Sequence, residues 1–102
     1  MMKYIRKMME AYKNNKNFHA PSISLEVNCI YSYDTLLAVI DKKTMHLNTT
    51  RYSRTTSTQQ SDLIRIAPEY GLKIKEYTGD KLASWHFRKV FFCTLNPNKK
   101  TP

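Results

Sequence analysis

The middle of the chain has the sequence Asn48-Thr49-Thr50-Arg51-Tyr52-Ser53-Arg54-Thr55-Thr56-Ser57-Thr58-Gln59-Gln60-Ser61. It lies in a stretch without acidic residues between Asp41 and Asp62, and it has no aliphatic side chain to anchor it in a core. Hydroxyls, amides and arginines are the groups that contact a polyanion backbone. The same Thr and Ser side chains can instead satisfy local backbone groups and hold a tight turn. The sequence supports an anion-binding segment and a structural turn about equally.

This segment ends where we expect a helix to start. Ser57 is followed three residues later by Gln60, and Thr56 by Gln59, which is the spacing of a capping box. An apolar face follows at Leu63, Ile64 and Ala67. We therefore predict a helix that begins at Ser57 and presents the backbone N–H groups of Thr55, Thr56 and Ser57 as an anion site.

Upstream of this segment, apolar spacing predicts one helix and several strands. From Met2 to about Lys16 the apolar residues fall on one helical stripe, formed by Met1, Ile5, Met8 and Tyr12. This stripe is expected either to cover the core or to dock a protein partner, because Met adapts to irregular surfaces. The alternation from Ile23 to Tyr31 predicts one half-buried strand, and the apolar run from Leu36 to Ile40 predicts a buried one.

The remaining elements complete a small α+β domain. Asp41–Thr44 is predicted to be a four-residue hairpin loop, after which Met45–Leu47 returns antiparallel. Leu72–Tyr77 predicts a short strand, Lys81–Lys89 fits a helix or a strand, and Val90–Leu95 predicts a strand. We expect an N-terminal helix, a small antiparallel sheet of four to five strands and one central helix. They would form a single domain over residues 1–95, followed by a polar, disordered tail over residues 96–102.

Composition narrows the classes of function. Seventeen Lys and Arg against eight Asp and Glu give a net charge of +9, which favours an acidic partner over an ordinary basic domain. Glycine occurs only at positions 71 and 79, which excludes a Gly-rich phosphate loop. The histidines, cysteines and carboxylates lack the spacing of a metal or catalytic site. We therefore expect no catalytic residue, no metal and no cofactor.

No apolar run is long enough for a membrane span, and the N-terminal residues lack the apolar region of a signal peptide. These two features predict a cytoplasmic protein that does not bind a membrane. A second aromatic and basic cluster, Trp85-His86-Phe87-Arg88-Lys89, lies near the C-terminal end of the chain. We expect Trp85 and Phe87 to be buried in the core, as large aromatic side chains usually are.

Two motifs resemble those of a small domain of unknown function that recurs in proteins of phages and other mobile elements of Gram-positive bacteria. They are Ser-Tyr-x-Thr at Ser32–Thr35 and Tyr-Ser-x-Thr-Thr-Ser at Tyr52–Ser57, and the resemblance spans about Tyr31 to Arg65. A histidine often found near the start of the following helix in that family is glutamine here, at 59 or 60, so its role is not carried over. Similar small basic proteins occur in replication operons of staphylococcal cassette elements, beside a polymerase and a helicase. The resemblance implies a biological setting rather than a reaction.

We therefore predict a non-catalytic accessory protein of a mobile element or phage that binds single- or double-stranded DNA and assists a replication enzyme such as a DNA polymerase. Tyr52 is expected to stack on a base. The residues predicted to bind nucleic acid are Lys42, Lys43, Arg51, Tyr52, Arg54, Thr55, Thr56 and Ser57. The polymerase is predicted to dock on the apolar stripe formed by Met1, Ile5, Met8 and Tyr12. The alternative is a protein–protein interaction module or an inhibitor of a host enzyme.

Overall fold

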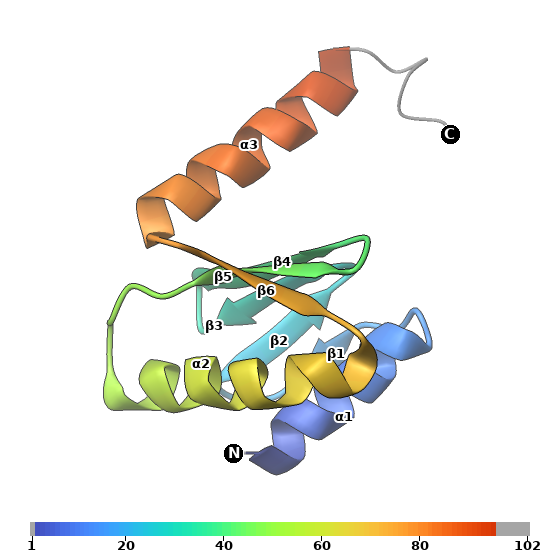
Figure 1. The fold of residues 1–102 in the computed structure, drawn as a ribbon, viewed down its shortest axis with the longest axis vertical. Helices are drawn as coiled ribbons and strands as arrows, with labels where there is room; N and C mark the ends of the chain where they lie inside the picture. Colours follow the sequence, from blue (N-terminus) through green and yellow to red (C-terminus); the bar gives the residue numbers. More distant parts are fainter. Residues whose placement is uncertain (1, 96–102) are drawn as a thin grey trace.

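A six-stranded sheet lies between two layers of helices in this computed structural model (Figure 1). The structure describes the backbone of residues 2–95 and the side chains of residues 3–88. α1 (Met2–Lys13) and α2 (Arg54–Ile66) cover one face of the sheet, and the first turns of α3 (Gly79–Leu95) cover the other. The α+β prediction is confirmed for this part of the chain. Met1 and the predicted tail over residues 96–102 lie outside the described residues.

The strands follow one another across the sheet in the order of the chain. They are β1 (Phe18–His19), β2 (Ile23–Glu26), β3 (Cys29–Ser32), β4 (Thr35–Asp41), β5 (Thr44–Asn48) and β6 (Lys73–Tyr77). Each pair is antiparallel except β5 and β6, which are parallel because α2 and the 3₁₀ helix η1 (Ala67–Tyr70) return the chain between them. The sheet is thus larger than predicted and mixed rather than antiparallel.

The stretch predicted as one strand from Ile23 to Tyr31 is a hairpin of two strands. Val27 and Asn28 form its turn, and Val27 has a left-handed φ of +59°, which is uncommon for a β-branched residue. The Val27 N–H donates to Asn17 Oδ1 at 2.9 Å, and Asn28 Nδ2 donates to the Ile40 carbonyl at 2.9 Å. Because polar side chains fix this turn and the Val27 side chain is 78% exposed, apolar alternation did not reveal it.

The C-terminal prediction of a strand over Val90–Leu95 is wrong, because α3 is continuous from Gly79 to Leu95. The Thr78 hydroxyl accepts from the Lys81 N–H at 3.3 Å, in the position of a helix N-cap. Leu82 is fully buried against Cys29 and Val39 of the sheet, and Trp85 packs beside it. This three-residue spacing places both side chains on the helix face that meets the sheet.

The main core fills the space between the sheet and the first two helices. Ile5, Met8 and Met9 of α1 are fully buried there, together with Leu63 and Ile66 of α2. The prediction that Ile5 and Met8 dock a polymerase is therefore wrong, because both side chains are covered by this protein's own sheet and helix. Tyr12 is half-buried against the same core.

α1 is also tied to η1 at the surface. Arg6 forms an ion pair with Glu69 at 2.8 Å, and the Tyr70 hydroxyl donates to Glu10 at 2.6 Å. The hydrogen bond to Glu10 raises the pKa of Tyr70 to about 12. In residues 2–95, no helix combines the length and the apolar character needed to cross a membrane.

α2 begins at Arg54, three residues before the predicted start. Ser53 is its N-cap, with extended backbone angles (φ −149°, ψ 170°) and a hydroxyl that accepts from the Thr56 N–H at 3.2 Å. The capping boxes predicted at Ser57 and Thr56 are thus wrong, because both residues already lie inside the helix. Several Ser and Thr residues in this run could have served as the N-cap. Ser53 is the one whose own backbone is extended, as an N-cap requires.

Ser53→Ala is expected to lower the free energy of unfolding by about 1 kcal/mol, because the Thr56 N–H loses its acceptor. Ser57→Ala is the matched control at the start predicted from sequence, and it should change stability by less than about 0.5 kcal/mol. Urea denaturation of both variants, followed by circular dichroism, measures the difference. Equal losses in the two variants would contradict the assignment of the cap.

Candidate nucleic-acid interface

Much of the segment predicted to bind anions is a hydrogen-bonded junction between β5, α2 and α3. Asn48 Nδ2 donates to the Leu36 carbonyl at 3.0 Å and to the Tyr52 hydroxyl at 3.1 Å, while Asn48 Oδ1 accepts from the Thr50 N–H at 2.9 Å. Gln60 Nε2 donates to the carbonyls of Asn48 at 2.7 Å and Thr50 at 2.9 Å. We call this group of hydrogen-bonded residues the latch: Asn48, Thr50, Tyr52 and Gln60.

Thr56 belongs to the structure rather than to the surface. Its side chain is 3% exposed, and its hydroxyl is hydrogen-bonded to Ser32 Oγ at 3.1 Å and to Ser53 Oγ at 3.2 Å. The Ser57 N–H donates to the Ser53 carbonyl at 2.9 Å. The predicted anion cradle is therefore corrected: the Thr56 N–H bonds the side chain of the N-cap residue Ser53, and the Ser57 N–H makes the first backbone hydrogen bond of α2. The Ser32–Thr56 contact also joins the two motifs Ser-Tyr-x-Thr and Tyr-Ser-x-Thr-Thr-Ser.

The other predicted contacts are divided between two ends of the sheet. Arg51 and Tyr52 are exposed in the connection from β5 to α2, and Arg54 is exposed at the start of α2. Lys42 and Lys43 are exposed in the β4–β5 turn, at the opposite end of β5 (Figure 1). The predicted group is therefore not one site. Arg51 and Ser57 do line one small hollow of about 150 Å³. Thr55 is half-buried and does not line it.

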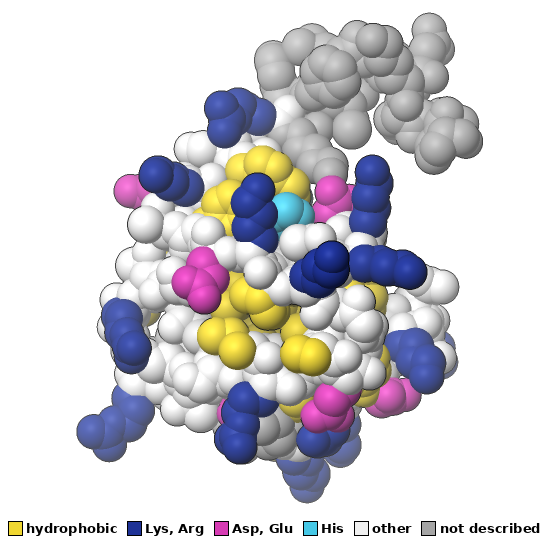
Figure 2. All heavy atoms as spheres, in the orientation of Figure 1, with side chains coloured by type: hydrophobic (Ala, Val, Ile, Leu, Met, Phe, Trp, Pro, Cys, Tyr) yellow, Lys and Arg dark blue, Asp and Glu magenta, His cyan; other side chains and the backbone are white. Residues whose placement is uncertain are grey.

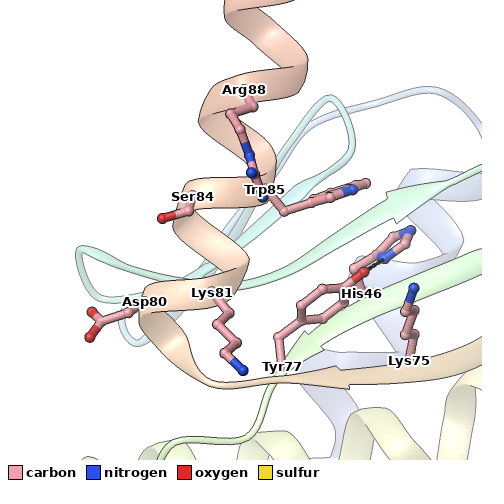
Figure 3. Close-up of a pocket in the computed structure, with 8 residues that line it drawn as sticks. All are labelled: His46, Lys75, Tyr77, Asp80, Lys81, Ser84, Trp85 and Arg88. Carbon is pink, nitrogen blue, oxygen red and sulfur yellow. Dashed lines mark hydrogen bonds between the residues drawn. The ribbon is translucent and has the colours of Figure 1, made fainter.

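A larger hollow lies on the other side of the sheet, between β6 and the first turns of α3. We call it the aromatic pocket. Its volume is about 480 Å³ (Figure 3). It is lined by His46, Lys75, Tyr77, Asp80, Lys81, Ser84, Trp85 and Arg88. These residues come from β5, β6 and α3, so only the folded chain brings them together.

Three aromatic rings form one wall of the aromatic pocket. Trp85 stacks on His46 with ring centroids 4.1 Å apart and an angle of 26° between the planes. The Tyr77 hydroxyl is hydrogen-bonded to His46 Nδ1 at 2.8 Å, and the Tyr77 and Trp85 centroids are 6.1 Å apart. Figure 3 shows the Trp85 ring over His46, with Tyr77 beside His46. Because His46 contacts both neighbours, it fixes the planes of Trp85 and Tyr77.

Positive charge surrounds these rings. Lys75, Lys81 and Arg88 are exposed, and Lys75 Nζ lies 5.6 Å from the centroid of the Tyr77 ring, within reach of a cation–π attraction. Asp80 is the one acidic residue in the lining, and Figure 3 shows its carboxylate pointing away from the rings. In Figure 2, Lys and Arg side chains border the hydrophobic surface and a histidine in the upper part of this face.

The sequence-based prediction did not include this pocket. It assigned Trp85 to the core, although Trp85 is half-buried at the pocket wall, and it assigned Phe87 to the core, although Phe87 is 66% exposed. One signal was available: Lys81, Trp85 and Arg88 are spaced by four and three residues and share a helix face. It was hidden because the stretch Lys81–Lys89 fits a strand equally well.

A cysteine and a histidine also meet on this side of the sheet, outside the pocket lining. Cys29 Sγ lies 3.6 Å from His86 Nε2, but the thiol is only 8% exposed and burial raises the pKa of Cys29. A thiol with a raised pKa stays protonated at neutral pH, which is unfavourable for a nucleophile. Among the described residues, no three His, Cys, Asp or Glu side chains gather closely enough to hold a metal ion.

The latch holds the first residue of α3 and thereby one side of the aromatic pocket. The Gly79 N–H donates to Thr50 Oγ1 at 2.7 Å. A Cβ atom at Gly79 would clash with the Tyr52 hydroxyl and would lie 3.2 Å from Asn48 Nδ2. A larger residue than Gly79 would therefore displace the Tyr52 hydroxyl from the start of α3.

Gly79→Ala should lower the free energy of unfolding by about 1–3 kcal/mol, the usual cost of inserting a methyl group into a packed site. Helix propensity alone predicts the opposite sign. In a Tyr52→Phe background the cost should shrink by about 1 kcal/mol, because the clashing hydroxyl is gone. A denaturation double-mutant cycle measures this coupling, with Ser84→Ala as an exposed control on the same helix. Zero coupling would show that Tyr52 does not contact α3.

Comparison with known proteins adds a family but no activity. A model of a family of unknown function, DUF8033, matches residues 3–65, which is more than half of the chain. No curated protein and no solved structure matches this chain. The matched residues include the latch and His46, whereas the rest of the aromatic pocket follows Arg65. The chain therefore belongs to the DUF8033 family.

Proposed function

We propose that this protein binds nucleic acid through the aromatic pocket and the basic side chains around it. The observation that carries the proposal is a cluster of three rings, in which Trp85 stacks on His46 and the Tyr77 hydroxyl is hydrogen-bonded to His46. Three cations line the same hollow as these rings: Lys75, Lys81 and Arg88. Proteins that bind nucleic-acid strands combine aromatic rings, which stack on bases, with cations that attract phosphates.

The charge of the whole chain supports the same ligand. A net charge of +9 attracts a polyanion from a distance and raises the rate of association. Arg51 and Tyr52 add exposed groups in the connection that contacts Gly79, close in the fold to the start of α3. The bound strand can therefore extend from the aromatic pocket over the β5–α2 connection.

The biological setting that we propose is that of a non-catalytic accessory protein of a phage or mobile element that assists a replication enzyme such as a DNA polymerase. The support is the resemblance of the motifs at Ser32–Thr35 and Tyr52–Ser57 to those of such elements. A docking surface for the enzyme has to be sought outside Ile5 and Met8, since both are in the core.

Fluorescence anisotropy with a labelled oligonucleotide, measured from 50 mM to 300 mM salt, tests the binding proposal. We expect micromolar or tighter binding at low salt and a steep loss as salt rises, because condensed counterions are released on binding. Lys81→Gln should weaken binding severalfold and reduce the slope of log K against log salt by about 1. A wild-type protein that binds no oligonucleotide at 50 mM salt would overturn the proposal.

Lys7→Gln is the matched control for Lys81→Gln. Lys7 is an exposed lysine of α1, on the opposite face of the sheet, and its replacement removes the same charge. The control should leave the affinity within about twofold of the wild type and the salt slope nearly unchanged. If both variants weaken binding equally, the affinity comes from net charge rather than from the aromatic pocket.

A further inference from the structure

We infer that the aromatic pocket takes one unstacked nucleotide, so that the ligand is a single strand rather than a duplex. This inference rests on the proposed nucleic-acid binding and names its substrate class. Its first support is the shape of the site, a hollow of about 480 Å³, which is in the range that encloses a small organic ligand. The bases of a duplex are covered on both faces by their neighbours. A ring wall inside a hollow therefore reaches only a base that has left the stack.

The second support is how the rings are held. His46 is 8% exposed, stacks on Trp85 and is hydrogen-bonded to Tyr77, so it supports both rings and offers little surface to a ligand. Trp85 and Tyr77 are half-buried, and the angle between their planes is 34°. Both rings line the hollow with their planes fixed in advance. A planar base can stack on these rings without the entropy cost of fixing their orientation on binding.

The third support is the position of the cations around the hollow. Lys75 comes from β6, on the side of the Tyr77 ring, while Lys81 and Arg88 come from one face of α3. Arg88 lies seven positions after Lys81 in α3, which is about 10 Å along the axis. They can therefore contact phosphates on either side of a nucleotide that enters between them. Ser84 is exposed in the lining between these two turns, and its hydroxyl, which Figure 3 shows directed away from the rings, can donate to a phosphate of the strand.

A single strand fits better than a free nucleotide, because the positive charge extends beyond the pocket. Arg51 and Arg54 are exposed in and next to the connection that contacts the start of α3, and a mononucleotide that occupies the pocket would leave them unused. Several phosphates on one chain contact several cations at once and gain affinity from each.

The sequence supplies a direct reporter, since Trp85 is the single tryptophan of the chain. Titration with a 20-nucleotide single strand should quench its fluorescence to saturation, because a base stacks on the indole. The same strand in a 20-base-pair duplex should bind at least tenfold more weakly at equal salt and cause no comparable quenching. A mononucleotide should quench only at concentrations at least a hundredfold higher than the strand.

A pair of variants on adjacent residues tests the location. Ser84→Glu places a negative charge in the pocket lining and should weaken single-strand binding at least tenfold. Ala83→Glu adds the same charge at the neighbouring exposed residue, outside the pocket lining, and should change the affinity less than threefold. Circular dichroism spectra matching the wild type are required of both variants before their affinities are compared.

The outcomes separate the two proposals. Equal binding of single strand and duplex without quenching would overturn the inference and leave the proposed function standing. Failure of both nucleic acids to bind would overturn both. Single-strand binding that is equally sensitive to Ser84→Glu and Ala83→Glu would also overturn the inference, because the strand would then lie outside the pocket. A mononucleotide as effective as the strand would replace it as the ligand.

Discussion

The arrangement of this fold depends on the buried side chain of Asn48. One amide group satisfies the Leu36 carbonyl on the neighbouring strand, the Tyr52 hydroxyl and the Thr50 N–H, while the Asn48 carbonyl accepts from Gln60. A buried polar group without partners is costly, so these bonds act as a unit that is favourable only when all its members are in place. Through Thr50 the unit reaches Gly79, the first residue of α3, beside the strand β6 that pairs with β5.

The sequence predicted those parts of the fold in which apolar spacing alone decides the structure. The stripe of α1 and the buried run of β4 are of this kind, because each side chain is placed by the period of its own element. The hairpin at Val27 and the cap at Ser53 depend instead on single hydrogen bonds, to Asn17 and from Thr56. Such bonds are made by residues that occur equally well in other loops, so spacing does not distinguish them.

The candidate site was less accessible to sequence reasoning, for a different physical reason. The hydroxyl-rich segment was notable for its composition, which fitted both a structural turn and an anion-binding segment. In the structure, Thr56 is buried and serves the turn, while Arg51 and Arg54 are exposed. The aromatic pocket has no compositional signal, because His46, Tyr77 and Trp85 come from three elements. Only the parallel pairing of β6 with β5 places Tyr77 and Lys75 beside His46.

The order of the strands has a consequence for the entropy of folding. From β1 to β5, successive strands are joined by short turns, so each antiparallel pairing closes a small loop and restricts little additional chain. The pairing of β5 with β6 has to close a loop that contains α2 and η1. The largest single loss of chain entropy thus falls on the step that also assembles the aromatic pocket. Two hydrogen bonds of the β5–α2 connection form at that same step, from the Thr49 N–H to the Tyr77 carbonyl and from the Gly79 N–H to Thr50 Oγ1.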